Sequence, residues 1–232
     1  MKLNAHEIAR LIDISAVQAP HGKAEIQEAV RAAKQYHFIA VHVLPCWVTL
    51  LRKELNGAPD VLLGAPVGFP SGGHRTEIKV AEAKLLAEDG VQEMDMMLNV
   101  GKLCSGDVDY CEREIHSVVD AVRPIPVKVI IEVHHLDSEE IRQACEACIS
   151  AGAAFVKTAS GWAASGATLE IVRYIKSVVG DRIKVKAAGG IRGLETLVKM
   201  HHMGVARFGI NLKTAVEIVR AVESLPGGCI EA

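Results

Sequence analysis

The chain contains the stretch FVKTASG at residues 155–161, in which a lysine ends an apolar run and small residues follow. A strand that is covered on both faces is a nearly continuous apolar run, so a lysine inside one requires a reason. The stretch IKVKAAGG at residues 183–190 repeats the arrangement, with Lys186 just before two glycines. If the two strands are neighbours in a parallel sheet, Lys157 and Lys186 point into one pocket. Each ammonium group is then expected to lower the pKa of the other, which would make a neutral, nucleophilic lysine available.

On both sides of these stretches, apolar runs of strand type alternate with longer amphipathic runs, which is typical of β-α repeats around a parallel sheet. Strands are expected at residues 11–14, 39–43, 62–67, 93–98, 127–133, 154–159, 184–188 and 207–210. Helices are expected at residues 24–36, 46–55, 77–89, 108–122, 138–150, 169–179, 194–203 and 213–223, after a short leading helix at 4–10. Eight strand–helix units predict an α/β protein with the TIM (β/α)8 barrel fold and a short extra N-terminal helix. A doubly wound open sheet is the alternative, but its G-x-G-x-x-G motif does not follow the first strand.

Length and composition limit the possible functions. The chain has 232 residues and is 50% hydrophobic, and α/β barrels of roughly 200–250 residues run as one domain, so residues 1–232 are expected to form a single domain. The 26 basic and 28 acidic residues give a net charge of −2 without blocks of like charge, which argues against nucleic acid or membrane partners and favours a small-molecule ligand. The sequence shows neither a signal-peptide pattern nor an apolar run of about 18 residues, so a cytoplasmic location is expected.

The cysteines and paired histidines do not indicate a metal or redox site. Six cysteines at irregular spacings are expected to be reduced thiols, because a chain of this size does not need disulfides to hold its fold. Cys145 and Cys148 form a C-x-x-C motif within the helical pattern at 138–150, and we interpret them as small apolar helix residues. The histidine pairs at 134–135 and 201–202 are adjacent residues whose side chains point apart, so no metal site is expected from them.

The barrel prediction gives special weight to polar residues at the C-terminal ends of strands, where barrel enzymes place their active sites. The candidates are Asp13, His42, Asp95, Asn99, Glu132, Lys157 and Lys186, with Lys128 deeper in its strand. Two glycine-containing stretches, at 189–192 and 208–211, follow the seventh and eighth strands. Barrels commonly bind phosphate there through backbone N–H groups and a helix N-terminus, so we expect an anion site.

The sequence resembles the deoxyribose-phosphate aldolase family from about Ile8 to Gly209. The matching segments are GFP (68–70), TEIKVAEA (76–83), EMDM (93–96), NVG (99–101), KVIIE (128–132), FVKT (155–158) and KAAGGIR (186–192). The resemblance implies a class I aldolase, a lyase that needs no metal or other cofactor. Its reaction is the reversible cleavage of 2-deoxy-D-ribose 5-phosphate to acetaldehyde and D-glyceraldehyde 3-phosphate. A homodimer is expected only by analogy with this family.

The resemblance also implies roles for individual residues. Lys157 matches the lysine that forms the Schiff base, and Lys186 matches the partner that keeps it neutral. Asp95 matches the carboxylate that relays protons with a water during carbinolamine and enamine formation, and Lys128 matches a further charged member of that network. The residues that the comparison places at the substrate are Asp13, Ser15, Gly161, Gly189, Gly190, Arg192, Gly209 and Asn211.

The chain departs from the family pattern at the phosphate end of the site. The last loop reads GINL at 209–212, where the family usually supplies two serines to the phosphate. His42 stands where the family commonly has a cysteine. Two alternatives to the family reaction therefore remain: the same lysine chemistry on a different, unphosphorylated aldehyde or sugar, and a non-catalytic sugar-phosphate sensor on the same scaffold. A barrel isomerase with a carboxylate base is disfavoured because it would leave paired Lys157 and Lys186 unexplained.

Overall fold

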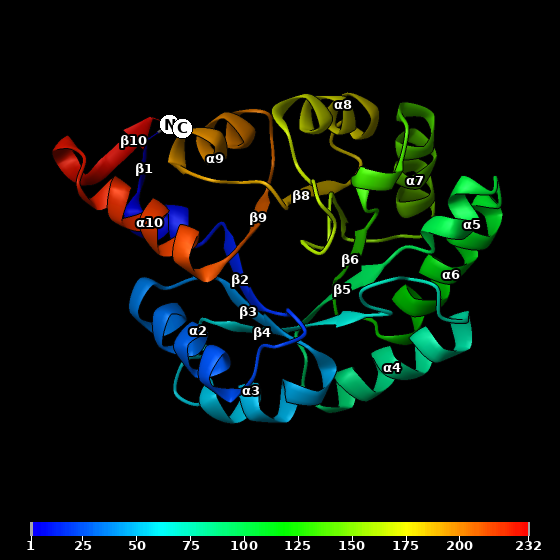
Figure 1. The fold of residues 1–232 in the computed structure, drawn as a ribbon, viewed down its shortest axis with the longest axis horizontal. Helices are drawn as coiled ribbons and strands as arrows, with labels where there is room; N and C mark the ends of the chain where they lie inside the picture. The colour runs from blue at the N-terminus through cyan, green and yellow to red at the C-terminus, as the bar shows by residue number, and fades with distance from the viewer. Residues whose placement is uncertain (1, 232) are drawn as a thin grey trace.

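The computed structural model describes residues 2–231, and its centre is a closed barrel of parallel strands (Figure 1). The barrel strands are β2 (Ile12–Ala16), β3 (Ala40–Val43), β4 (Leu62–Val67), β5 (Glu93–Met97), β6 (Val127–Ile130), β7 (Phe155–Lys157), β8 (Lys184–Ala188) and β9 (Arg207–Ile210). They follow one another in chain order around the barrel, and β9 closes it by pairing with β2 in parallel. The predicted TIM barrel is confirmed.

Helices surround the barrel, as Figure 1 shows. They are α2 (Lys23–Tyr36), α3 (Val48–Glu54), α4 (Thr76–Glu88), α6 (Val108–Ala121), α7 (Ser138–Ser150), α8 (Leu169–Val179), α9 (Leu194–His202) and α10 (Leu212–Glu223), with short α5 (Val100–Cys104) before α6. Their apolar residues recur at helical spacing, so that one face is buried: in α10 this face carries Ala215, Ile218, Val219 and Val222. The eight predicted helices are confirmed, and α5 is an addition.

Three strands end before their predicted bounds: β5 by one residue, β6 by three and β7 by two. The run at 127–133 leaves regular strand geometry after Ile130, because Glu132 adopts a left-handed conformation with φ of 53°. A 3-10 turn, η2 (Val133–His135), follows it directly. The neighbouring chain after β7 still pairs with this segment, since the backbone N–H of Val133 donates to the carbonyl of Thr158. The loops after β5, β6 and β7 therefore start one to three residues earlier than the apolar runs suggest.

The chain ends meet outside the barrel. Strand β1 (Lys2–Asn4) pairs antiparallel with β10 (Cys229–Glu231), next to the labelled ends in Figure 1. The following helix α1 (Ala5–Ala9) begins with a capping box, in which Asn4 and Glu7 exchange side-chain to backbone hydrogen bonds. The leading helix was predicted, whereas this two-stranded sheet was not.

A buried ion pair ties two helices to the barrel near the site. Nζ of Lys79 on α4 lies 2.7 Å from Oε2 of Glu114 on α6, and it also donates to the carbonyl of Met97 at the end of β5. The stem of Lys79 packs on Gly68, where φ is +66° and an added Cβ would lie 2.8 Å from Cε of that lysine. The helix motif at 76–83 thus holds the end of the strand that carries Asp95.

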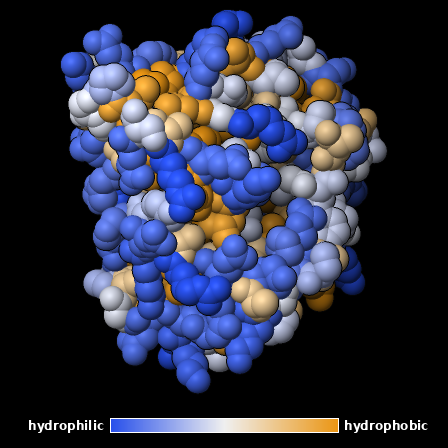
Figure 2. Space-filling model, turned by 60° about the vertical axis from the view of Figure 1, so that its left-hand side comes forward, coloured by the Kyte–Doolittle hydropathy of each residue, from blue (hydrophilic) through white to orange (hydrophobic). Residues whose placement is uncertain are grey.

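The surface and the thiols agree with the sequence analysis. Figure 2 shows a face on which hydrophilic residues predominate and hydrophobic residues gather in small patches. The six cysteines, all inside the described range, are free, and Cys145 and Cys148 are buried in the middle of α7. Of the helices that the structure describes, none combines the length and the apolar character that crossing a membrane requires.

Candidate active site

The C-terminal end of the barrel is built around two lysines on neighbouring strands. Lys157 ends β7 and lies in register with Lys186 of β8, and both side chains are buried. Each ammonium nitrogen donates a hydrogen bond to the same atom, Oδ2 of Asp95 on β5, at 2.7 Å. The two lysine side chains therefore lie in one pocket, as the sequence analysis predicted.

The two lysines differ in their electrostatic surroundings. Burial lowers the pKa of Lys157 to about 8, and the neighbouring charges of Lys186 and Lys128 contribute, while Asp95 opposes the shift. Burial also disfavours the charged form of Lys186, but Asp13, Asp95 and Glu93 outweigh it and raise the pKa of that lysine. The two lysines were expected to be shifted downward together, but the net shift of Lys186 is upward, because Oδ2 of Asp13 lies 2.6 Å from its Nζ.

A layer of charged side chains lies below the lysine pair, inside the barrel. Nζ of Lys128, fully buried on β6, is 2.6 Å from Oε1 of Glu93 and 3.5 Å from Oδ1 of Asp95. Arg207 of β9 donates from Nε to Oδ1 of Asp13 at 2.8 Å and from Nη2 to Oε1 of Glu93 at 2.9 Å. Burial and the charge of Asp13 act to raise the pKa of Glu93, but the hydrogen bond with His42 and the charge of Lys128 outweigh them and hold it at about 2. Lys128 is thus a charged member of the network, deeper in the barrel, as its position in the strand predicts.

Glu93 and Arg207 were not singled out by the sequence analysis, which sorted polar residues by strand end. Both begin their strands, β5 and β9, and still point into the barrel. One signal was available for Glu93: it stands two residues before Asp95, and alternate residues of a strand share a face. Arg207 is paired in register with Lys186, which only the barrel topology reveals.

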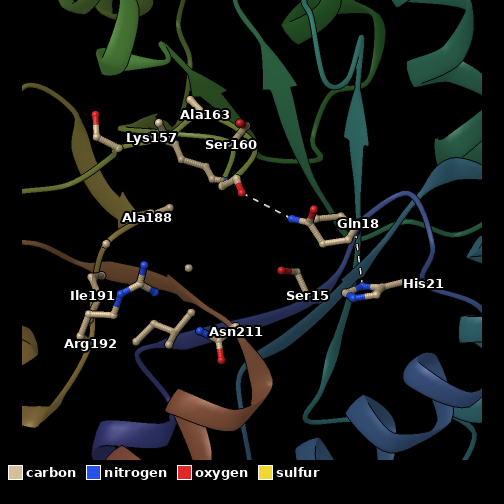
Figure 3. Close-up of a pocket in the computed structure, with 18 residues that line it drawn as sticks. Ser15, Gln18, His21, Lys157, Ser160, Ala163, Ala188, Ile191, Arg192 and Asn211 are labelled. Atoms are coloured by element: carbon tan, nitrogen blue, oxygen red, sulfur yellow. Dashed lines mark hydrogen bonds between the residues drawn. The ribbon is translucent and has the colours of Figure 1, made fainter.

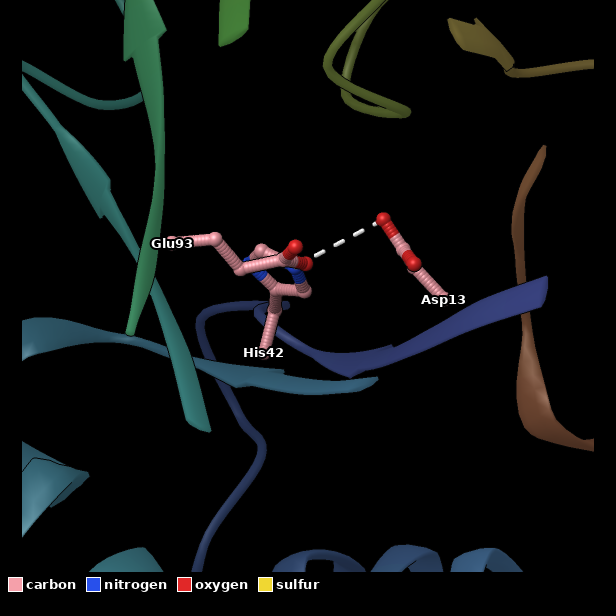
Figure 4. A group of neighbouring side chains, drawn as sticks. All are labelled: Asp13, His42 and Glu93. Carbon is pink, nitrogen blue, oxygen red and sulfur yellow. Dashed lines mark hydrogen bonds and ion pairs between the residues drawn. The ribbon is translucent and has the colours of Figure 1, made fainter. Parts of the chain in front are cut away.

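Asp13, His42 and Glu93 converge from β2, β3 and β5 (Figure 4). Their ligand atoms lie within 4.8 Å of one another, a spacing at which three such groups can hold a metal ion. The same two carboxylates, however, already accept contacts from a lysine or arginine at 2.6 to 2.9 Å. A divalent cation here would lie against several positive charges, so the arrangement is better explained as an ion-pair network.

Above the lysines, a cavity of about 220 Å³ opens between the loops that follow β2, β7, β8 and β9 (Figure 3). The predicted residues that line it are Ser15, Lys157, Gly161, Gly189, Gly190, Arg192, Gly209 and Asn211. Gln18 and His21, which the sequence analysis did not name, form the opposite side from Arg192. A smaller, deeper chamber shares Lys157 with this cavity and is lined by Asp13, Asp95, Lys186 and His42. Lys157 therefore stands at the junction of a solvent-open cavity and a buried charged chamber.

Comparison with known proteins agrees with this site. The model of the DeoC/LacD family aldolases matches residues 9–211 of the chain. The chain belongs to that family. A deoxyribose-phosphate aldolase of Sinorhizobium medicae is 50% identical over 229 residues, which cover 99% of this chain and 92% of the relative.

Two solved structures place this DeoC/LacD aldolase among enzymes of the same barrel. QR15, an aldolase, superimposes with a TM-score of 0.86 at 37% identity, covering 93% of this chain and 95% of that one. A deoxyribose phosphate aldolase of Aeropyrum pernix, described as a tetramer, gives a TM-score of 0.84 at 26% identity and covers 96% of this chain and 93% of that one. The family resemblance drawn from the sequence motifs is thus confirmed.

The loop after β7 is fixed by hydrogen bonds of residues close to Lys157. Oγ1 of Thr158 both donates to the carbonyl and accepts from the N–H of Ala188, which joins the ends of β7 and β8. The carboxylate of Glu132 accepts from the backbone N–H of Ser160. Trp162 closes this loop onto the β2 loop, because its Nε1–H donates to the carbonyl of Val17 at 3.1 Å. Glu132, a sequence candidate, therefore positions the loop.

Other candidates have local structural roles. The side chain of Asn99 caps α5 by accepting from the N–H of Lys102. Asn211 lines the cavity, but its amide oxygen accepts from the N–H of Thr214 and its Nδ2 donates to Oγ1 of the same residue, so it caps α10. Lys213, in the first turn of α10, lines a separate groove between α2 and α10. The histidines at 134–135 are exposed. The expectation that their side chains point apart was wrong, because in the 3-10 turn η2 the two ring centroids lie 4.9 Å from each other in an edge-to-face contact.

Proposed function

We propose that this DeoC/LacD aldolase works as a class I aldolase on 2-deoxy-D-ribose 5-phosphate, with Lys157 as the Schiff-base nucleophile. The observation that supports this most is the unequal lysine pair. With a pKa of about 8, about a tenth of the Lys157 side chains is neutral at pH 7, against roughly 0.03% at the ordinary value of 10.5. Reactive amine is therefore present near neutral pH without a metal or another cofactor.

In the proposed mechanism, neutral Lys157 adds to the aldehyde carbon of the donor and forms a carbinolamine, which loses water to give an iminium ion. Asp95 hydrogen-bonds the amine before reaction, so its carboxylate is placed to relay the protons that leave nitrogen and reach oxygen. Lys186 keeps its proton and supplies positive charge beside the amine. The positive charge of Lys128, deeper in the barrel, offsets the negative charges of Glu93 and Asp95. The cluster holds three carboxylates, so a neutral Lys157 leaves them balanced by two lysines and an arginine.

The open cavity is the proposed site of the sugar chain and its phosphate. Gly189 and Gly190 have φ values of +74° and +100°, which favour glycine and turn the chain after β8 around the cavity. The exposed Arg192 lies on this turn, and helix α10 begins at the cavity wall after Asn211. A cationic side chain together with a helix N-terminus favours an anionic group. Ser15 and Gly161 would contact the uncharged part of the sugar, and Asp13 would act through Lys186.

A second candidate, the same reaction on an unphosphorylated aldehyde or sugar, is favoured by one observation. Asn211 stands in the loop where the family usually has serine donors, and both ends of its amide are engaged by Thr214. Each missing hydrogen bond to a charged group weakens binding by about 1.5–3 kcal/mol. The choice between the two substrates therefore depends on how much Arg192 and the backbone N–H groups compensate.

Retro-aldol kinetics test the proposal. We expect kcat/KM for 2-deoxyribose 5-phosphate to exceed that for 2-deoxyribose at least tenfold, since the cavity offers a cation to the phosphate, a factor equal to about 1.4 kcal/mol. The Arg192→Met variant should reduce this preference and leave the value for free deoxyribose nearly unchanged. Equal values for both sugars would favour the unphosphorylated substrate. Binding of the sugar phosphate without any acetaldehyde release would favour the sensor.

A further inference from the structure

We propose that His21, in the loop after β2, binds the terminal phosphate of the substrate through its Nε2–H and so replaces a donor that the loop after β9 lacks. This inference rests on the proposed function, because it concerns the phosphate of 2-deoxyribose 5-phosphate. From β2 and the loop that follows it, the family resemblance places Asp13 and Ser15 at the substrate. His21 adds a specificity-determining residue to these two.

His21 stands beside the loop in which the serine donors of the family are replaced. Strand β2 pairs with β9, with Ile14 opposite Ile210, so the loops that follow these strands are neighbours. The half-buried side chain of His21 lines the active-site cavity across from Arg192 (Figure 3), and it also lines the groove between α2 and α10. Asn211, which precedes α10, borders the same two hollows. The imidazole is therefore placed at the phosphate end of the cavity.

The hydrogen bond of the ring determines which nitrogen can donate. Nδ1 of His21 accepts from the backbone N–H of Gln18 at 3.3 Å. A backbone N–H only donates, and a neutral imidazole carries one proton, so this proton is on Nε2. Within residues 2–231 the ring makes no other hydrogen bond, and the Nε2–H is therefore free to donate to a ligand in the cavity.

Two contacts hold the loop that carries His21. Nε2 of Gln18 donates to the carbonyl of Gly161 at 3.4 Å, and Nε1 of Trp162 donates to the carbonyl of Val17 at 3.1 Å. Both contacts join the loop after β2 to the loop after β7. The imidazole is thus positioned before a substrate arrives, and a preorganised donor binds its ligand with a smaller loss of conformational entropy.

The charges around His21 favour an anion on the cavity side of the ring. Glu25, an acidic residue that interacts with His21, turns its carboxylate toward the start of α2, where it accepts from the backbone N–H of Gly22 at 2.8 Å. The cavity side offers Arg192 and the N-terminus of α10, both of which favour negative charge. A hydrogen bond to an ionised acceptor is roughly twice as strong as one between neutral groups. The Nε2–H of His21 therefore favours a phosphate over the hydroxyl group of a free sugar.

Two substitutions at this position separate a phosphate ligand from a support of the loop. In His21→Asn the amide oxygen can replace Nδ1 as the acceptor for Gln18, but no donor remains at the place of Nε2, whereas His21→Gln puts an amide N–H there. The measurement is the ratio of kcat/KM for 2-deoxyribose 5-phosphate to kcat/KM for 2-deoxyribose. We expect this ratio to fall at least tenfold in His21→Asn, chiefly through KM, and less than threefold in His21→Gln. His116→Asn, which removes an exposed histidine on α6, should leave it unchanged.

The outcomes distinguish this inference from the proposed function. A ratio within threefold of the unaltered protein in a folded His21→Asn sample would overturn the role of His21 and leave the proposed function intact. An equal fall of the ratio in His21→Asn and His21→Gln would also overturn it, because the loss would then come from the loop and not from the Nε2–H. Equal values of kcat/KM for the two sugars in the unaltered protein would overturn the phosphorylated substrate, and this inference with it.

Discussion

Removing the charge of Lys186 should make Lys157 a more ordinary lysine. In Lys186→Met, Asp13 keeps Arg207 as a partner and Asp95 keeps Lys157, so neither carboxylate is left without a cation. The repulsion between the two ammonium groups disappears. Oδ2 of Asp95 then accepts a hydrogen bond from Lys157 and no longer from position 186. Both changes favour the charged form of Lys157, so its pKa should rise.

The size of this rise follows from the geometry. Each ammonium nitrogen lies 2.7 Å from the same oxygen, so the two nitrogens are at most twice that distance apart. At about 5 Å and an effective dielectric constant of roughly 20, two unit charges interact by about 3 kcal/mol, which corresponds to roughly 2 pKa units. The neutral fraction of Lys157 at pH 7 should then fall from about a tenth to about 0.1%, a loss of roughly 100-fold.

The assay is the rate of imine formation with acetaldehyde between pH 6 and pH 10.5, with Lys184→Met as the matched control. Lys184 is exposed on the same strand two residues earlier, so its removal should leave the profile unchanged. For Lys186→Met we expect the rate at pH 7 to fall about 100-fold and to recover toward the unaltered value at the alkaline end. An unchanged midpoint with a uniformly lower rate would refute the electrostatic role of Lys186 and leave it a merely structural one.

Three further predictions concern stability. Burial lowers the pKa of Lys157 to about 8 from 10.5, so the unfolded chain binds more protons than the folded protein between these pH values. The free energy of unfolding of the unaltered protein, relative to that of Lys157→Met, should therefore rise by roughly 3 kcal/mol between about pH 8 and pH 10.5. A difference in urea unfolding that stays constant over this range would contradict this. Lys79→Met should lower the free energy of unfolding by about 3–5 kcal/mol, because it leaves the buried carboxylate of Glu114 without its cation. The loss should be smaller at acid pH, since burial raises the pKa of Glu114 and the protonated side chain is neutral. An equal loss at all pH values would argue against the ion pair. Thr158→Val removes both hydrogen bonds to Ala188 and should cost about 1–3 kcal/mol in thermal unfolding, whereas an unchanged Tm would show that they contribute little.

The barrel could be predicted from the sequence because buried parallel strands and amphipathic helices have different periods. The strands at 62–67, 184–188 and 207–210 were located to the residue, since each is an apolar run bounded by turn residues. The pair β1 and β10 was missed because each strand has three residues and finds its partner at the other end of the chain. Short α5 was also missed, because Asn99, which caps it, was interpreted as a site candidate at a strand end.

The juxtaposition of Lys157 and Lys186 could be predicted because a charged residue in an apolar run stands out. The sign of the shift on Lys186 was not accessible, because it depends on a contact with Asp13 across the barrel. Arg207 meets Asp13 where the barrel closes, 194 residues away in sequence. Contacts of this kind follow from strand register and from the closure of the barrel, and no local pattern encodes them.

Borohydride trapping with acetaldehyde tests the central claim most directly. The protein is reduced in the presence of acetaldehyde at pH 7.5, digested and examined by peptide mass spectrometry. We predict a single ethylated lysine, Lys157, and no ethylation in Lys157→Ala. Modification of Lys186 instead, or of exposed lysines only, would contradict the assignment of the neutral amine to Lys157.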